Sequence, residues 1–191
     1  MSTAERILDV AEGLAQTRGF NGFSYADIAA EVGVTKASLH YHFATKAELG
    51  RALMVRYSDG FSAALDVIAA DSDDACAKLQ RYVDLFEAVL VLDRLCLCGM
   101  FAAEILTLPP ALQDAVRAFF DRNESWLAEV LLAGRNAQTL EFRGTALDVA
   151  RYIVGTLEGA MLLAYSYGDV ARFGVAAEHL LSEMGTPAAV R

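Results

Sequence analysis

The side chains best suited to recognise a ligand gather between Gly33 and Ala47. This stretch contains two lysines, two histidines and several hydroxyl groups, and it contains no acidic residue. Ammonium, imidazole and hydroxyl groups donate hydrogen bonds to anionic oxygens, so an anionic partner is expected. The whole chain carries a net charge of −9, yet a locally basic surface is compatible with nucleic-acid binding that weakens steeply with salt. The side chains concerned are Thr35, Lys36, Ser38, His40, Tyr41, His42 and Lys46.

No combination of residues indicates catalysis. His40 and His42 belong to this stretch, whereas His179 lies far along the chain, so the three histidines do not predict one catalytic group. Neither a glycine-rich phosphate loop nor a Gly-x-Ser-x-Gly elbow is present. Cys96 and Cys98 have no histidine near them and supply too few ligands for a metal ion. We therefore expect no enzyme activity, no cofactor and no metal site.

Helix-capping signals place the basic stretch on short helices. One capping pair opens a helix that ends at Gly33, which supplies a left-handed stop. The next cap opens a second short helix that is too polar to lie in a core, and a third pair then opens a long helix. Two short helices joined by a glycine turn predict a helix-turn-helix. The caps are Ser24 with Asp27, Thr35, and Thr45 with Glu48.

The rest of the sequence predicts an all-α fold of about nine helices. No sustained period-two alternation and no Asn-Gly or Asp-Gly hairpin is present. We expect a three-helix head with the helix-turn-helix over residues 1–47 and a helical body over residues 48–191. Beyond the helix-turn-helix, the expected helices run over Thr3–Arg18, Lys46 to about Ala69, about 75–92, about 95–106, from Pro110 to about Ala133, Thr145 to about Tyr167, and Asp169 to Met184, with a polar loop at 136–144.

The composition predicts a globular cytoplasmic protein. Of 191 residues, 55% are hydrophobic, which is enough for a sizeable core. The longest run without a charged side chain, residues 159–168, is far shorter than the roughly 20 apolar residues of a membrane span. The N-terminal sequence lacks the basic and apolar regions of a signal peptide. Three cysteines are an odd number and do not predict a disulfide framework.

A series of short motifs spans residues 23–49: Ile28-Ala29, Gly33-Val34, Ser38-Leu39, His42-Phe43, and Lys46 with Leu49. This series resembles the DNA-binding motif of the TetR/AcrR family of bacterial transcriptional regulators. Two positions depart from the family pattern, since Ala37 stands where glycine or another small residue is common and His40 stands where tyrosine is common. A protonated imidazole can contact a phosphate as that phenol does.

The resemblance implies a homodimer that binds double-stranded DNA through the second helix of the motif. Residues at the start of that helix are expected to contact base edges, and residues around it are expected to contact phosphates. For Ser24 and Thr35 the alternative is helix capping alone, and for Tyr41 and His42 it is packing or an ordinary hydrogen bond. The base-edge candidates are Thr35, Lys36 and Ser38, and the phosphate candidates are Ser24, His40, Tyr41, His42 and Lys46.

The resemblance also implies a small-molecule pocket in the body. Large apolar residues and a few polar ones are expected to line it, although each could instead fill a core. Cys96 and Cys98 lie near a predicted helix start, where a thiol pKa is lowered, so an oxidant or electrophile sensor is the alternative, as is a pair of inert buried cysteines. The pocket candidates are Tyr82, Phe86, Leu90, Met100, Phe101, Glu104, Phe119, Phe120, Asn123 and Trp126.

The last two long helices are expected to form the dimer interface, with a monomer core as the alternative. Together these features predict a ligand-responsive homodimeric regulator, a repressor released from a palindromic operator by a small and mostly apolar effector. The alternatives are a thiol-based repressor and a helical interaction protein that does not bind DNA. The interface candidates are Ile153, Val154, Leu157, Ala160, Met161 and Ala164.

Overall fold

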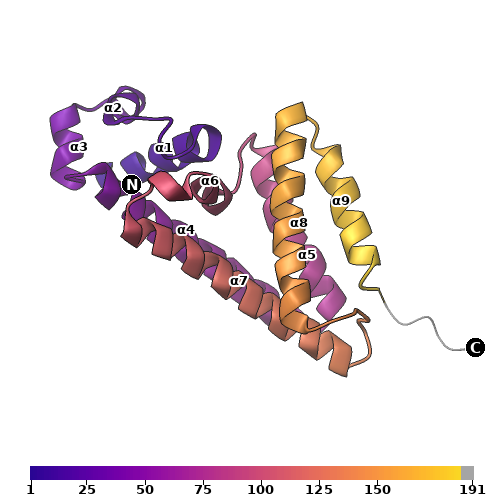
Figure 1. Cartoon of the computed structure of the whole chain (residues 1–191). Coiled ribbons are helices and arrows are strands. Elements are labelled where there is room, and N and C mark those ends of the chain that lie inside the picture. Colours follow the sequence, from indigo (N-terminus) through magenta and orange to yellow (C-terminus); the bar gives the residue numbers. More distant parts are fainter. Residues whose placement is uncertain (186–191) are drawn as a thin grey trace, which may run out of the picture. The chain divides into compact units, whose positions relative to one another are not determined.

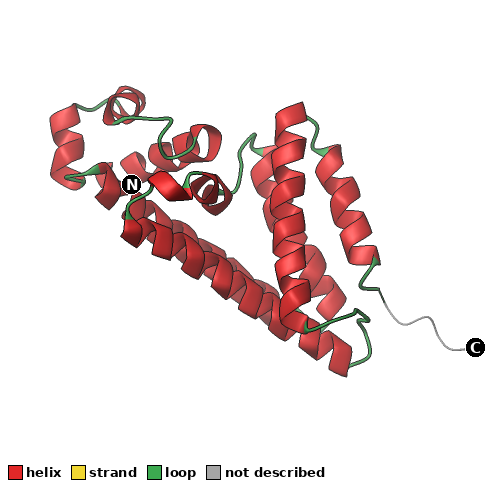
Figure 2. Ribbon diagram, viewed as in Figure 1, coloured by secondary structure: helices red, strands yellow, loops and turns green. Residues whose placement is uncertain are grey.

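The computed structural model describes residues 1–185, and all regular secondary structure in this part is helical (Figure 2). This confirms the predicted all-α fold. No helix within residues 1–185 is long and apolar enough to cross a membrane. The elements, labelled in Figure 1, are α1 (Thr3–Arg18), α2 (Tyr25–Val32), α3 (Lys36–His42), α4 (Lys46–Asp71), α5 (Ala75–Val91), α6 (Leu97–Ala103), the short 3-10 helix η1 (Ile105–Thr107), α7 (Pro110–Asn136), α8 (Ala146–Tyr167) and α9 (Ala171–Ser182).

The chain divides into two compact units. Unit 1 comprises Met1–Gly60 and Arg94–Phe119, and unit 2 comprises Phe61–Asp93 and Phe120–Arg191. The long helices α4 and α7 therefore each contribute residues to both units. The expected boundary between residues 47 and 48 falls inside α4, and the assignment of separate functions to its two sides stays a prediction.

In unit 1, α2 begins and ends at the predicted caps. Ser24 and Asp27 form a capping box at the start of α2, as Ser2 and Glu5 do at the start of α1. Gly33 ends α2 with a φ of 76°, in the left-handed region that glycine adopts without strain. The helices then bury apolar side chains that recur at helical spacing. Side chains with 0% exposure in this unit include Ile7, Ile28, Leu39, Leu49 and Leu53.

The segment expected to be one helix at about 95–106 is two shorter elements, α6 and η1. Leu95 lies outside α6, where its N–H donates to the carbonyl of Gln16 at 3.2 Å. At the other end, the backbone of Glu104 leaves the helical range, with φ −104° and ψ 12°. The Thr107 hydroxyl donates to the Glu104 carbonyl at 2.8 Å, which favours the tighter turn of η1. Periodicity predicted one regular helix here. The structure instead has the hydrogen bond from Leu95 to α1 before α6 and the hydrogen bond from Thr107 to Glu104 after it.

In unit 2, α5, α8 and α9 pack together. Thr145 caps α8, since its hydroxyl accepts from the Asp148 N–H at 3.1 Å. Helix α7 does not stop before Gly134 as expected, but continues through it. A Cβ at this position would lie 2.5 Å from Leu140 Cδ1 and 2.7 Å from Ala75 Cβ. Gly134 therefore permits close packing and is not a helix stop.

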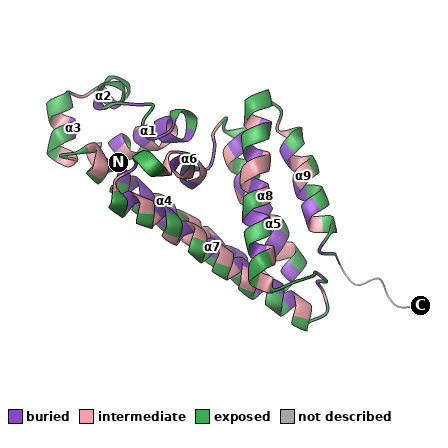
Figure 3. Ribbon diagram, viewed as in Figure 1, coloured by how far each residue is buried: buried purple, intermediate pink, exposed green. Residues whose placement is uncertain are grey.

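The apolar stripe of α8 that we expected at the dimer interface is buried inside unit 2. Figure 3 shows α8 with buried residues along one side and exposed residues along the other. Periodicity identifies which side of a helix is buried, but it does not identify what covers that side, and here α5 and α9 pack against α8. This corrects the predicted interface: Ile153, Val154, Leu157, Met161 and Ala164 are at most 6% exposed, and Ala160 is half-buried.

Candidate nucleic-acid interface

Helix α3 presents most of the residues expected to contact DNA. Its first turn is capped by Thr35, whose hydroxyl accepts a hydrogen bond from the Ser38 N–H at 3.2 Å. Leu39 is 0% exposed and is the buried residue of α3. Because α3 is anchored through this one side, its other side is open to a partner (Figure 3).

The accessible side of α3 carries donors of several kinds. Tyr41 is 86% exposed, and its ring centroid lies 5.2 Å from that of His42. A phenol and an imidazole therefore lie side by side near the end of the helix. The predicted residues Ser24, Thr35, Lys36, His40 and Tyr41 are exposed, whereas Ser38, His42 and Lys46 are half-buried.

Tyr25, which we did not predict as a functional residue, fixes the end of α3. Its hydroxyl donates to the carbonyl of Phe43 at 2.8 Å, and its ring centroid lies 4.8 Å from that of His40. Burial, and to a smaller extent the Glu48 carboxylate, raises the pKa of Tyr25 to about 12, so the phenol keeps its proton at neutral pH. His40 Nδ1 lies 3.1 Å from the carbonyl oxygen of Ala44, so its other ring nitrogen is the atom left for a phosphate.

Arg6 supports the turn before α3 from the first helix. Its Nη2 donates to the carbonyl of Val32 at 2.5 Å, at the C-terminal end of α2. A helix end has carbonyls without intrahelical partners, and a guanidinium satisfies one of them. Arg6 and Tyr25 lack a local sequence signal because their partners lie 26 and 18 residues away.

Lys46 is directed toward the interior of unit 1. Its ammonium donates to the carbonyl of Phe23 and lies 4.8 and 4.3 Å from the ring centroids of Phe20 and Phe23. Desolvation by burial lowers the pKa of Lys46, while the carboxylates of Glu104 and Asp27 oppose this effect. A phosphate contact by Lys46 stays a prediction, and it requires the ammonium to leave the Phe23 carbonyl.

The net negative charge of the chain belongs almost entirely to unit 2. Unit 1 contains 8 basic and 9 acidic residues, whereas unit 2 contains 8 basic and 16 acidic residues. The acids of unit 1 include Asp9 and Glu12, both paired with Arg56 at 2.6 and 2.5 Å. Since no acid lies between residues 33 and 47, the surface of α3 carries no repulsive charge toward a polyanion.

The predicted effector residues fall in both units. In unit 2, the Tyr82 hydroxyl donates to Asn123 Oδ1 at 3.1 Å, and the Tyr82 ring stacks on Trp126 with centroids 5.8 Å apart. Phe86 and Phe61 lie 5.4 and 6.1 Å from the same tyrosine ring. These five residues form an aromatic cluster in which the buried polar groups of Tyr82 and Asn123 satisfy each other. Leu90 and Phe120 are the remaining predicted residues of unit 2, one buried and one half-buried.

The four predicted effector residues of unit 1 pack within that unit. Phe101 lies edge-on to Phe20 with centroids 5.3 Å apart, and Phe119 lies 5.7 Å from Tyr57. Glu104 accepts hydrogen bonds from the α1–α2 turn, and Met100 is half-buried. These side chains form contacts between helices of unit 1, and a ligand role for them stays a prediction.

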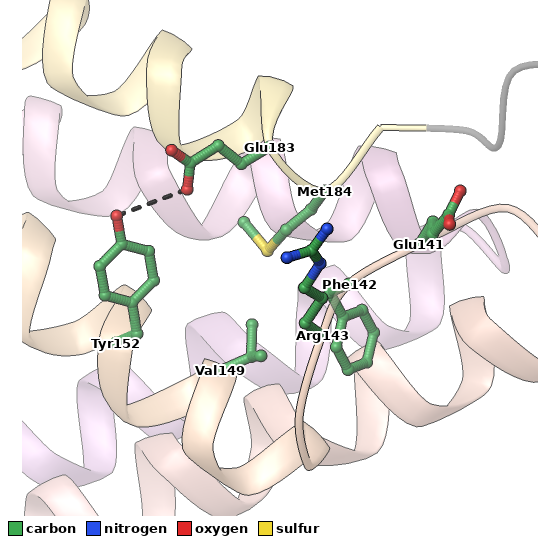
Figure 4. Close-up of a pocket in the computed structure, with 7 residues that line it drawn as sticks. All are labelled: Glu141, Phe142, Arg143, Val149, Tyr152, Glu183 and Met184. Atoms are coloured by element: carbon green, nitrogen blue, oxygen red, sulfur yellow. Dashed lines mark hydrogen bonds between the residues drawn. The ribbon is translucent and has the colours of Figure 1, made fainter.

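Two cavities of unit 2 differ in their lining. A groove of about 380 Å³ lies beside the aromatic cluster, within the range of small-molecule sites. Another cavity, of about 630 Å³, lies at the ends of α8 and α9, where Tyr152 donates to Glu183 at 3.5 Å and the charged side chains of Glu141 and Arg143 also line it (Figure 4). The groove is lined by Ser62, Leu65, Asp66, Asp121, Arg122, Ser125, Trp126 and Glu129, and the second cavity by Glu141, Phe142, Arg143, Val149, Tyr152, Glu183 and Met184.

The cysteine pair singled out from the sequence is buried. Cys96 and Cys98 are 2% and 0% exposed, and all three cysteines are free thiols. Cys96 Sγ lies 3.5 Å from the Tyr57 hydroxyl, and Cys98 Sγ lies 3.9 Å from the sulfur of Met54. Cys76 is exposed, but burial and the Asp74 carboxylate raise the pKa of its thiol. The thiol that solvent reaches is therefore less ionised than an ordinary cysteine.

An exposed, polar α3 packs against α2, which packs against α1. These three helices form the DNA-binding head of a helix-turn-helix regulator, and comparison with known proteins identifies its family. Residues 7–53 match the family described as bacterial regulatory proteins, tetR family. The crystal structure of a TetR-family regulator from Agrobacterium tumefaciens is 33% identical and superposes with a TM-score of 0.94, covering 96% of this chain and 98% of that one. The chain belongs to the TetR family of transcriptional regulators.

Two further relatives are similar over most of the chain. A TetR transcriptional regulator from Legionella pneumophila is 34% identical, with a TM-score of 0.86 and coverage of 96% of this chain and 98% of that one. The nucleoid occlusion factor SlmA of Photobacterium profundum is 27% identical over 161 residues, which are 82% of this chain and 81% of SlmA. The resemblance stated from the motifs is confirmed, as is the prediction of a regulator and not an enzyme.

Proposed function

We propose that this protein is a homodimeric repressor that binds a palindromic operator and is released by a small, mostly apolar effector. The observation that carries the proposal is α3, which is anchored through Leu39 and exposes Lys36, Tyr41 and other donors on a surface without acids. We assign DNA binding to residues 1–47 and effector binding and dimerisation to residues 48–191, and we place the protein in the cytoplasm with its DNA.

Within the head, residues at the start of α3 are the proposed base readers. Lys36 can donate to guanine O6 and N7, and the hydroxyls of Thr35 and Ser38 can bond either donors or acceptors on bases. Tyr41 and His42 lie one helical turn further on and suit phosphate oxygens. Ser24 lies at the N-terminal end of α2, where anions are favoured. His40 and Lys46 are the remaining proposed phosphate ligands. His40 offers the ring nitrogen that does not face Ala44, and Lys46 offers its ammonium once this group has left the Phe23 carbonyl.

For the effector, we propose the aromatic cluster of unit 2 and the groove beside it. Trp126 belongs to both, since it stacks on Tyr82 and lines the groove of about 380 Å³. Trp126 and Leu65 supply apolar surface to the groove, and the charged and hydroxyl side chains around them supply the polar groups that would orient a ligand.

For the dimer, we propose the exposed side of α8 together with the exposed side of α9. Leu162, Leu163 and Val175 are 48%, 61% and 55% exposed, which is unusual for large apolar residues clustered on one surface. A cavity of about 400 Å³ between the two helices is lined by Leu163 and Val175. Gly155 and Gly159 have nothing within 4 Å of a Cβ placed on them, so this side of α8 permits a close approach.

The DNA-binding proposal is tested by selecting random duplex DNA with the purified protein. We expect enrichment of one inverted repeat, with half-sites about one helical turn apart and affinity that falls steeply with salt. Lys36→Ala should lose about 1–3 kcal/mol of binding and relax the sequence preference. Lys78→Ala, which removes a lysine from α5, is the matched control. If no sequence is enriched at low salt, the proposed function is wrong.

The effector proposal is tested through the single tryptophan of the chain. A panel of small apolar compounds should contain ligands that change Trp126 fluorescence and release the selected operator at the same concentration. A compound that releases the operator without changing the fluorescence would place the effector site elsewhere.

A further inference from the structure

The turn between α1 and α2 is held by residues more than 80 positions further along the chain. Glu104, between α6 and η1, accepts the Asn21 N–H with its two carboxylate oxygens, at 3.3 and 3.1 Å. Thr107 Oγ1 accepts from the Asn21 side-chain amide at 2.7 Å and donates to the Glu104 carbonyl at 2.8 Å. Asn21 is thus held by both its backbone and its side chain. We name these three residues the clasp.

The turn is shaped to admit the clasp. Gly19 has a φ of 76°, and a Cβ on it would lie 2.7 Å from Glu104 Oε1. A side chain at this position would therefore displace the carboxylate. Beside these polar contacts, Phe20 packs edge-on against Phe101 of α6. The segment between α1 and α2 thus meets α6 and Glu104 through an aromatic contact and a charge-assisted hydrogen bond.

The position of the clasp in the chain connects it to both units. Asn21 precedes Ser24, the cap of α2, by three residues. Glu104 belongs to Arg94–Phe119, the second segment of unit 1. This segment is covalently continuous with α5 at its start and with the unit 2 part of α7 at its end. The clasp therefore joins the start of α2 to a segment whose two ends continue into unit 2.

We propose that Glu104 and Thr107, acting through Asn21, set the position of α2 and α3 that DNA binding requires. The DNA-binding half of this inference rests on the proposed function. Glu104 is a positioning residue, because it touches the turn and not the DNA. A coupling of this kind is reciprocal, so DNA bound to α3 must also stabilise α6 and η1.

The inference is tested by hydrogen–deuterium exchange on the full chain, free and with the selected operator duplex. In Glu104→Ala, amides of α2 and α3 should exchange about tenfold faster, as expected for loss of a hydrogen bond to a charged group. In the wild type, operator DNA should slow exchange in α6 and η1, and in the variant this protection should disappear. Glu87→Ala removes an exposed carboxylate from α5 and is the matched control. Equal exchange in the two variants would overturn the inference.

A double-mutant cycle keeps the test decisive if Glu104→Ala folds poorly. Asn21→Ala and Thr107→Val each remove one partner of the same side-chain hydrogen bond. If the clasp acts as described, each should weaken operator binding, and the double variant should bind no more weakly than either single variant. Strictly additive losses would show that the two residues act separately and would overturn the clasp.

Hydrogen–deuterium exchange of the protein without DNA distinguishes a failure of the proposed function from a failure of the clasp. If the selection finds no operator but Glu104→Ala still loosens α2 and α3, the proposed function fails and the positioning role stands. If an operator is found and the variant binds it as tightly as Glu87→Ala does, the proposed function stands and the clasp has no role in it.

Discussion

Two tyrosines of the head differ in what their hydroxyl groups contact. Removing the hydroxyl of Tyr25 is expected to lower stability, and removing the hydroxyl of Tyr41 is expected to weaken DNA binding. Tyr25 donates to the Phe43 carbonyl at 2.8 Å and is 9% exposed. Tyr41 is 86% exposed, and it is a proposed phosphate ligand. Tyr25→Phe, in α2, and Tyr41→Phe, in α3, are the same chemical change made at a buried and at an exposed position.

The expected magnitudes follow from these contacts. Tyr25→Phe loses one hydrogen bond at the end of α3, which costs about 1 kcal/mol of stability and lowers Tm by roughly 2–4 °C for a chain of this size. Tyr41→Phe removes a hydroxyl from an exposed side chain, so stability changes by less than about 0.5 kcal/mol. A lost hydrogen bond to a phosphate instead weakens operator binding by about tenfold or more per subunit.

The raised pKa of Tyr25 predicts a second difference between the variants, in how their stability depends on pH. Burial raises it from 10.0 to about 12, so the folded protein keeps a proton that the unfolded chain loses. The stability that this provides is complete below pH 10 and is lost as the pH rises from 10 to about 12. Tyr25→Phe lacks this dependence, so the difference in Tm between the variant and the wild type should narrow across that interval.

The assays are thermal unfolding monitored by circular dichroism, from pH 7 to 12, and operator binding by fluorescence anisotropy at fixed salt. The reasoning predicts one variant with reduced Tm and one with reduced affinity. If Tyr41→Phe lowers Tm as much as Tyr25→Phe does, Tyr41 has a structural partner. If Tyr41→Phe leaves affinity unchanged, its proposed phosphate contact is refuted.

Three further changes test features of unit 2. Gly134→Ala should destabilise the fold by about 1–3 kcal/mol by overpacking, although alanine favours helices. Gly60→Ala, in an open part of α4, should instead stabilise the fold by roughly 0.5–1 kcal/mol. Equal effects of the two changes in thermal unfolding would contradict the packing at Gly134. Leu163→Arg should give folded monomers in analytical ultracentrifugation, whereas Ile153→Asp, at a 2% exposed position, should unfold the chain; a folded Leu163→Arg dimer would refute the proposed interface. Iodoacetamide should label the native protein first at Cys76, and mass spectrometry that found the buried pair labelled first would revive the thiol-sensor alternative.

Most of the fold could be predicted because its signals are local. The capping boxes at Ser2 and Ser24, the left-handed Gly33 and the cap at Thr145 each depend on residues three or four positions apart, and each is present in the structure. The exposed side of α3 could also be predicted, since a helix with one strong apolar anchor cannot be buried on all sides. Its individual DNA contacts stay predictions until DNA is bound.

What could not be predicted depends on distant partners. The stripe through Ile153 was correctly identified as a buried surface of α8, but the pattern is the same whether the chain itself or a second copy covers it. Glu104 was expected in a pocket because a carboxylate among apolar residues needs a partner, and that partner proved to be Asn21, 83 residues away. Gly134 was expected to end a helix, but α7 continues through it, and its lack of a side chain permits close packing against Leu140 and Ala75.

Unit 1 is assembled from two segments that the ribosome makes at different times. Its first segment ends at Gly60, and its second is complete only at Phe119, so at about 5–20 residues per second an interval of roughly 3–12 s separates them during synthesis. For most of that interval Phe20 lacks its aromatic partner Phe101 on α6, and Asn21 lacks Glu104. A nascent chain stalled within α5 therefore carries the complete sequence of α3 but lacks the α6 and η1 residues that hold the turn before α2.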